Sequence, residues 1–131
     1  MSPSITVAVG AVIVRNGSLL LIRRANDPGA GRWSLPGGRV EAGERLHEAL
    51  VRELREEIGV EAQIGGLVGI VERCGRDHHF LIVDYRATVD PEARPVAGDD
   101  AADVAWVPLP VLGEWDLVDG LAEFLSEHSI T

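Results

Sequence analysis

The pattern of hydrophobic and polar positions predicts β-strands in the first part of the chain. Two apolar runs, ITVAVGAVIV and SLLLIRR, flank an Asn-Gly pair at residues 16–17. This dipeptide between apolar runs is the strongest short signal for a β-hairpin. The sequence therefore predicts a hairpin over residues 5–24, then a short extended piece at 33–35 and a turn at 36–38.

The middle of the chain changes to a helical period. Apolar residues recur at helical spacing over residues 46–58, and Gly59 follows where a helix end favours a left-handed residue. The other expected elements are strands over 66–73, 79–89 and 104–107, a loop over 90–102, and an amphipathic helix over 117–128. This order predicts an α/β fold, a three-layer sandwich with one helix on each side of a mixed β-sheet.

The helix over residues 46–58 carries carboxylates where packing residues are expected. With Leu46 at zero and about 100° per residue, the apolar arc extends to roughly 140°. Glu57 falls at roughly 20°, inside that arc, while Glu53 and Glu56 fall along its edge at roughly 340° and 280°. Glu53 and Glu57 also repel each other as like charges four residues apart, and carboxylates beside a buried surface lose hydration.

A divalent cation would resolve this conflict, because hard cations such as Mg²⁺ take oxygen ligands and a helix offers several at spacings of three and four. The alternative is a solvated acidic face that is bridged by Arg52 and Arg55. The burial expected for Glu57 favours the cation.

Composition narrows the classes of partner. The chain has 131 residues and 46% hydrophobic content, which is enough for one packed domain over residues 1–131. Its net charge of −9 argues against binding a nucleic-acid polymer or an anionic membrane, since both need a basic face. A small anionic ligand remains compatible if cations bridge it to the protein.

Cysteine usage and hydropathy bear on the compartment. One cysteine, Cys74, leaves no internal disulfide. The first ten residues lack the pattern of a signal peptide, and no apolar run reaches the length of a membrane span. A cytoplasmic location is expected.

A longer motif contains the acidic helix. Gly38 is followed after five residues by Glu44, and after seven more by RELREEIGV over residues 52–60. This stretch resembles the Nudix box of the Nudix hydrolases at every defined position. The similarity extends to the preceding hairpin, the run WSLPGG over 33–38 and AWVPL over 105–109. The resemblance implies the Nudix α/β/α sandwich and hydrolysis of a nucleoside diphosphate linked to another moiety.

The resemblance also assigns roles to residues of the box. It implies Mg²⁺ or Mn²⁺ as the cofactor, with Glu53, Glu56 and Glu57 as ligands and catalytic residues, and a carbonyl of Gly37 or Gly38 as a further ligand. Glu53 or a neighbouring metal-bound acid would orient or deprotonate the attacking water.

Two further box residues have supporting roles by the same resemblance. Arg52 would hold the catalytic glutamates by ion pairing, although an ordinary helical pair with Glu48 or Glu56 would also account for it. Glu44 would lie near the metal and substrate through water.

Outside the box, candidate substrate contacts are fewer. An arginine at the place of Arg23 touches substrate phosphate in MutT-type members, and a solvated strand end is the alternative. Acids in the loop before Trp106 serve as extra metal or base groups in some members, and a solvated loop is the alternative. The candidates there are Asp99, Asp100 and Asp103. The first two, together with Glu72 and His79, are also candidates for hydrogen bonds to a terminal ribose.

The surroundings of the box look most like the small ADP-ribose pyrophosphatases, which release AMP and ribose 5-phosphate. Two alternatives remain: MutT-like hydrolysis of oxidised nucleoside triphosphates to monophosphate and pyrophosphate, and a non-catalytic nucleotide sensor. The complete set of box carboxylates favours an enzyme over a sensor. The expected partner is a nucleoside diphosphate-linked small molecule, and the resemblance leaves a homodimer open.

Overall fold

The computed structural model describes residues 4–98 and 100–130. Its elements, in chain order, are β1 (Thr6–Val12), β2 (Val14–Arg15), β3 (Ser18–Arg24), β4 (Trp33–Ser34), β5 (Gly37–Arg39), α1 (Leu46–Ile58), β6 (Ala62–Cys74), β7 (His79–Val89), β8 (Ala101–Pro108), a 3₁₀ helix η1 (Leu109–Glu114) and α2 (Leu121–Glu127).

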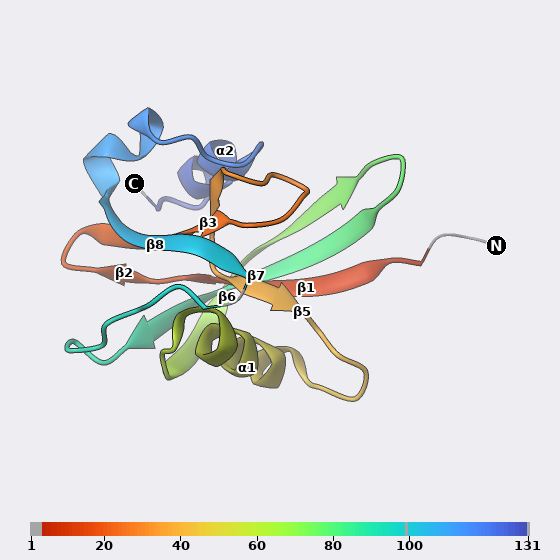
Figure 1. Ribbon diagram of the computed structural model, residues 1–131, viewed down its shortest axis with the longest axis horizontal. Coiled ribbons are helices and arrows are strands. Elements are labelled where there is room, and N and C mark those ends of the chain that lie inside the picture. The colour runs from red at the N-terminus through yellow and green to blue at the C-terminus, as the bar shows by residue number, and fades with distance from the viewer. Residues whose placement is uncertain (1–3, 99, 131) are drawn as a thin grey trace.

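A mixed four-stranded sheet, which we name sheet A, lies at the centre. Its strand order is β5-β1-β7-β6, with β1 parallel to β7 and antiparallel to β5, and β6 antiparallel to β7. Helix α1 lies on one side of the sheets and α2 on the other (Figure 1). The predicted α/β sandwich with a mixed sheet between helices is therefore confirmed.

The predicted hairpin over residues 5–24 is only partly right. Asn16 and Gly17 form the expected turn, with positive φ values of 52° and 76°, but only the two-residue β2 pairs with β3. Strand β1 instead pairs with β5 and β7, while β3 pairs with β4 and β8 in a second sheet, sheet B. Both apolar runs are too continuous for one hairpin with a solvated face, and each is buried between layers.

Helix α1 confirms the predicted bounds of 46–58. Leu50, Leu54 and Ile58 are fully buried against sheet A, and Gly59 ends the helix in the left-handed region with φ 68°. The side chain of Glu48 accepts a hydrogen bond from the backbone N–H of Arg45 (2.8 Å) at the first turn.

Other predicted bounds are wrong in ways that backbone pairing explains. The predicted turn at 36–38 is largely strand β5, because β1 offers it an antiparallel partner. The predicted helix over 117–128 begins only at Leu121, since residues 116–118 exchange backbone hydrogen bonds with Trp33. Strands β6 and β8 extend beyond 66–73 and 104–107, again through pairing that hydrophobic pattern does not reveal.

Within the described residues, none of the helices combines the length and the apolar character that crossing a membrane requires.

Candidate active site

Helix α1 places its acidic residues at different depths. Glu57 is buried, with 9% of its surface exposed, and its Oε1 accepts a hydrogen bond from the backbone N–H of Gly37 on β5 (2.9 Å). The side chain of Glu53 is 17% exposed and that of Glu56 is 61% exposed. The helical positions therefore give a buried, an intermediate and an open carboxylate on one side of α1, as the wheel predicts.

Strand β5 approaches α1 closely because it carries glycine. The carboxylate of Glu53 lies directly over Gly38, in the space that a β-carbon at residue 38 would occupy. Any larger residue there would displace Glu53. This close approach explains in physical terms why glycine stands at this position.

Arg52 connects four acidic or carbonyl groups around the site. Its guanidinium donates to both carboxylate oxygens of Glu44 (2.7 and 2.8 Å), to Glu53 (2.9 Å), to Glu56 (3.1 Å) and to the carbonyl of Arg39 (3.0 Å). The paired contact with Glu44 uses the planar fork that only arginine provides. Arg52 thus fixes the orientation of Glu53 and Glu56 and ties α1 to the preceding loop.

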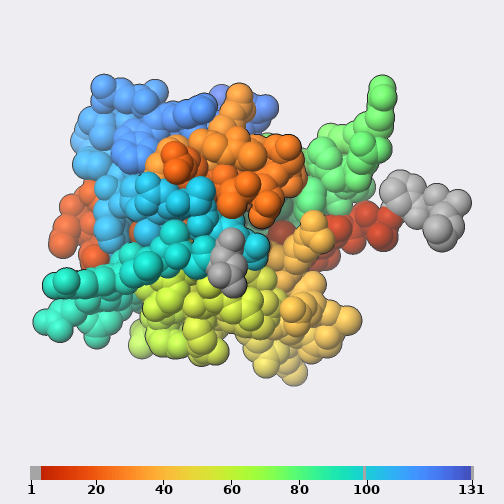
Figure 2. Space-filling model, viewed as in Figure 1, coloured from red at the N-terminus to blue at the C-terminus, as the bar shows by residue number. Residues whose placement is uncertain are grey.

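The loop before β8 is fastened to the end of α1. The backbone N–H of Gly98 donates to the carbonyl of Glu57 (2.6 Å), and that of Val96 donates to the carbonyl of Ile58 (3.0 Å). A β-carbon at Gly98 would overlap the carbonyl of Glu56, so this approach also requires glycine. The cyan segment lies between the yellow-green α1 and the orange loop after β3 (Figure 2). Asp100, which follows this attachment in the chain, lines the same cleft as the glutamates of α1.

Burial raises the pKa of two acids of this centre, and hydrogen bonding lowers the pKa of a third. Burial raises the pKa of Glu57 to about 7, opposed by the Gly37 hydrogen bond and assisted by the charges of Glu53 and Asp100. Burial likewise raises the pKa of Glu53, against the effect of Arg52. Hydrogen bonding from Arg52 lowers the pKa of Glu44 to about 2. Glu53 and Glu57 are therefore carboxylates short of positive charge, whereas Glu44 is already paired.

The donor set fits a hard divalent cation. Three carboxylates of one helix and the neighbouring backbone of β5 converge. Among the described residues, Arg52 is the cationic side chain that hydrogen-bonds to these carboxylates, and it does not contact Glu57. An added cation would lower the electrostatic cost of ionising Glu57 and Glu53 together.

The acidic centre opens into one cleft of about 1290 Å³ that runs toward α2. Beyond the glutamates, its lining includes arginines, aromatic side chains and further acids, among them Arg24, Arg32, Arg73, Phe80 and Asp84. The cleft is large enough for a nucleotide, and its walls beyond the acidic helix carry arginines as well as further acids.

The predicted residues outside the box are not all brought together. Asp100 lines the cleft, whereas Asp99 lies outside the described residues. Asp103 is exposed on β8 and caps the N–H of Val104 with its own side chain. Glu44, predicted near substrate, has both oxygens engaged by Arg52.

At the end of β3, the arginine that lines the cleft is Arg24 and not the predicted Arg23. Arg23 is exposed and lies outside the cleft, so the prediction that it meets substrate has no support from its position. The neighbouring Arg24 lines the cleft and donates to the carbonyl of Pro28 (2.6 Å). Successive strand residues point to opposite faces, and sequence alone did not fix which of the two arginines faces inward.

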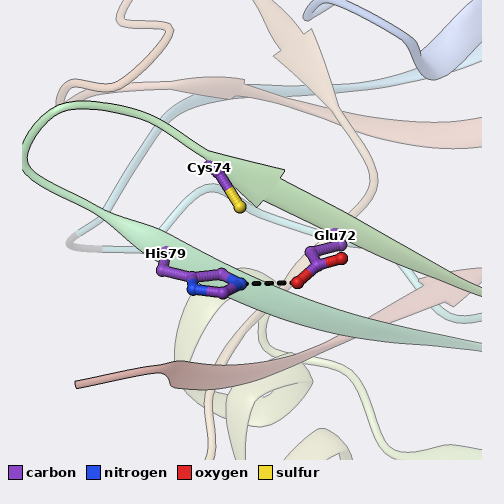
Figure 3. A group of neighbouring side chains, drawn as sticks. All are labelled: Glu72, Cys74 and His79. Atoms are coloured by element: carbon purple, nitrogen blue, oxygen red, sulfur yellow. Dashed lines mark hydrogen bonds and ion pairs between the residues drawn. The ribbon is translucent and has the colours of Figure 1, made fainter. Parts of the chain in front are cut away.

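Glu72 and His79, predicted as ribose contacts, lie together at the end of the β6–β7 hairpin. Glu72 and Cys74 are two residues apart on β6, and His79 pairs with Cys74 across the ladder, so all three share one face (Figure 3). His79 Nε2 lies 2.6 Å from Glu72 Oε2. Arg73 and Phe80, the alternating residues, point to the other face of the sheet.

Several residues of the cleft are not among the predicted site residues, including Arg24, Arg32, Arg73 and Asp84. The available signal for Asp84 is a single acid inside the otherwise apolar run HFLIV-D-Y of β7. A carboxylate in a strand that is buried on both faces is costly, and such a position merits attention.

Comparison with known proteins shows which proteins resemble this chain in sequence and architecture. The model of the NUDIX domain matches residues 4–127. The ADP-ribose pyrophosphatase of Methanocaldococcus jannaschii is 39% identical over 106 residues, which are 79% of this chain and 62% of that protein. The CTP pyrophosphohydrolase of Escherichia coli is 48% identical over 87 residues, 62% of this chain and 64% of that protein.

The solved structures agree with the sequence matches. A MutT NUDIX hydrolase from Burkholderia pseudomallei superposes with a TM-score of 0.85 at 30% identity, covering 94% of this chain and 97% of that one. The matched part of the chain spans less than two thirds of the two curated relatives named above.

Proposed function

The chain belongs to the NUDIX hydrolase family, and on that premise we propose that its acidic centre hydrolyses the diphosphate of a nucleoside diphosphate derivative. The observation that supports this most strongly is the convergence of Glu53, Glu56 and Glu57 beside β5: Arg52 orients the first two, and the N–H of the neighbouring strand holds the third. A ligand-sensing module would not need Glu53 and Glu57 held at the electrostatic cost that burial imposes on them.

Mg²⁺ or Mn²⁺ would be held by Glu53, Glu56 and Glu57, with a carbonyl of Gly37 or Gly38 beside them. When bound, the cation supplies charge neutralisation for the diphosphate and lowers the pKa of a coordinated water. The residues of the chain provide the geometry: Gly37 N–H holds one oxygen of Glu57, and Arg52 holds one oxygen of Glu53.

We assign Glu53 the task of orienting the attacking water and accepting its proton. Its Oε1 is held by Arg52, and its carboxylate rests on Gly38, so its position is fixed. Burial also raises its pKa, which makes the carboxylate a better proton acceptor than an exposed glutamate.

For the substrate we propose ADP-ribose, cleaved to AMP and ribose 5-phosphate. The support is the resemblance outside the box together with the Methanocaldococcus jannaschii relative, which matches 79% of the chain and carries the name ADP-ribose pyrophosphatase. The cleft continues past the acidic centre, so groups on both sides of a diphosphate find room.

Nucleoside triphosphates are the second candidate. The Escherichia coli CTP pyrophosphohydrolase is more identical over a shorter match, at 48% across 87 residues, and a MutT NUDIX hydrolase shares the fold. The box acts on the diphosphate alone, so it does not distinguish these substrates.

A side-by-side measurement of kcat/KM decides between them. The panel contains ADP-ribose, CTP, dGTP and 8-oxo-dGTP at saturating Mg²⁺, with a chelated control. We expect the highest kcat/KM for ADP-ribose. A higher value for a triphosphate would move the protein to that branch and leave the metal-dependent centre intact, whereas no metal-dependent turnover of any member would reject the hydrolase proposal.

A further inference from the structure

One buried acid of the cleft has no function in the mechanism above. Asp84 on β7 is 4% exposed and lines the same cleft as the acidic centre. Among the described residues, its Oδ1 is the buried side-chain polar atom that lacks a hydrogen-bond partner. A buried, unsatisfied carboxylate is expensive to keep, so its presence calls for a ligand.

A row of glycines connects Asp84 to the acidic centre across sheet A. Asp84 pairs with Gly10 on β1, and Gly10 pairs with Gly37 on β5, whose N–H holds Glu57. Strands in a sheet lie about 4.8 Å apart, so the backbones of Asp84 and Gly37 are roughly 10 Å apart. Asp84 therefore lies within reach of the group that adjoins a phosphate bound at Glu57.

Gly10, the neighbour of Asp84 on β1, leaves space for the carboxylate of Asp84. A β-carbon at Gly10 would overlap Oδ1 of Asp84, and on the other side Asp84 pairs with Gly69, whose surface is covered by Phe124 and His128. The carboxylate thus occupies a hollow between two strands instead of being displaced by side chains.

The charge state limits what Asp84 can bind. Burial raises its pKa to about 6, with the charge of Arg73 opposing the shift, so the group is mainly ionised at neutral pH. An ionised carboxylate only accepts hydrogen bonds, and it repels phosphate. The matching group on a nucleotide is a neutral hydrogen-bond donor, and a pair of neighbouring donors suits the two oxygens of a carboxylate best.

We propose that Asp84 determines substrate specificity by accepting hydrogen bonds from two neighbouring donors on the nucleotide. This inference rests on the proposed function, since the donors must belong to a substrate whose diphosphate lies at the acidic centre. Vicinal ribose hydroxyls carry this chemistry and adjoin the diphosphate of ADP-ribose. The imino and amino edge of guanine carries it as well, whereas adenine and cytosine present one donor beside one acceptor.

The test measures a substituted protein on substrates and on analogues that each lack one hydrogen-bond donor. Asp84→Asn keeps the shape but replaces one acceptor by a donor. Asp77→Asn, in the exposed loop between β6 and β7 and outside the cleft, is the matched control. The substrates are ADP-ribose and its analogue with a 2-deoxy terminal ribose, 2′-deoxyadenosine diphosphate ribose, and the pair GTP and ITP, which differ by the 2-amino group.

The expected result is a rise in KM of about tenfold to a hundredfold in Asp84→Asn, with kcat changed less than threefold, for the substrate that carries the donor pair. The analogue that lacks one donor should lose this sensitivity. Sensitivity to a ribose hydroxyl identifies ribose as the source, and sensitivity confined to GTP over ITP identifies guanine. Asp77→Asn should match the wild type throughout.

Equal losses on every substrate would overturn the proposal, because a purely structural role would produce them. No loss on any substrate would overturn it too. If Asp84→Asn does not fold, the wild type alone still decides: less than twofold discrimination within every donor pair contradicts the proposal. Wild-type turnover of GTP but not of ADP-ribose would reject ADP-ribose as substrate while leaving the role of Asp84 open to the GTP and ITP comparison, which then decides it.

Discussion

Glu57→Gln is expected to stabilise the metal-free protein while abolishing its activity. Burial raises the pKa of Glu57 from 4.5 to about 7. That difference of about 2.5 units corresponds to about 3 kcal/mol at about 1.4 kcal/mol per unit, which is the cost of ionising Glu57 in the folded state without a cation. A neutral glutamine removes this cost, and its Oε1 still accepts the hydrogen bond from Gly37.

The sign of the pH dependence follows from the raised pKa. In the folded state the carboxyl stays protonated up to about pH 7, whereas in the unfolded chain it ionises above about pH 4.5. The wild type therefore loses stability as pH rises between these values, and the loss is complete above about pH 7. The advantage of Glu57→Gln should be largest at pH 8 and vanish near pH 4.5.

Urea unfolding in the presence of a chelator measures the effect at pH 8 and pH 5. We expect a gain of about 1–3 kcal/mol in the free energy of unfolding at pH 8, because the glutamine gives back part of the ionisation cost as imperfect packing. Glu56→Gln is the matched control. Its side chain is 61% exposed, so its stability should stay within about 0.5 kcal/mol of wild type.

Added Mg²⁺ should reverse the order of stability. The wild type gains the free energy of cation binding, and Glu57→Gln gains less because it has lost one ligand. Turnover should fall by several orders of magnitude in this variant. A folded Glu57→Gln that is no more stable than the wild type at pH 8 without metal would refute the reasoning that burial makes this carboxylate costly to ionise. Near-native turnover would show that Glu57 is not a metal ligand.

Three further outcomes test the site. Exhaustive chelation should abolish turnover and Mg²⁺ should restore it; activity that persists without metal contradicts the cation. Arg52→Lys should lower kcat at least tenfold with little change in the circular dichroism spectrum, since lysine cannot hold both oxygens of Glu44 and also reach Glu53. Gly38→Ala should lower kcat at least a hundredfold, because its β-carbon displaces Glu53; a native rate would mean that the position of Glu53 is unimportant.

Local patterns predicted the helix better than the sheets. Residues 46–58 carry a strong helical period and end at Gly59, and α1 has these bounds. The strands near the N-terminus were harder, because the apolar run before residue 13 looks the same whether it pairs with β3 or with β7. That choice depends on contacts more than sixty residues away, as between Val9 and Val83.

The acidic centre was predictable because its acids are close in sequence. A helical wheel placed Glu57 in the packed arc, and the structure buries it. Residues contributed by strands were not predictable in the same way, since a shift by one residue exchanges the two faces. Arg23 and Arg24 show this directly: only Arg24 lines the cleft.

The distribution of charge in the cleft explains how a chain with a net charge of −9 can accept an anionic substrate. The glutamates of α1 gather at one end of the cleft, where a cation would offset their charge, and the rest of the lining carries both arginines and acids, Asp119 among them. Arg32 is itself held by Asp119 (2.7 Å), so part of its charge is already compensated. Arg24, Arg39 and Arg73 also line the cleft and form no salt bridge with an acid among the described residues, so they are available to phosphates beyond the metal. On the proposed function, we therefore expect selection between substrates to depend on these strand residues and Asp84, and the helix to act on the diphosphate alone.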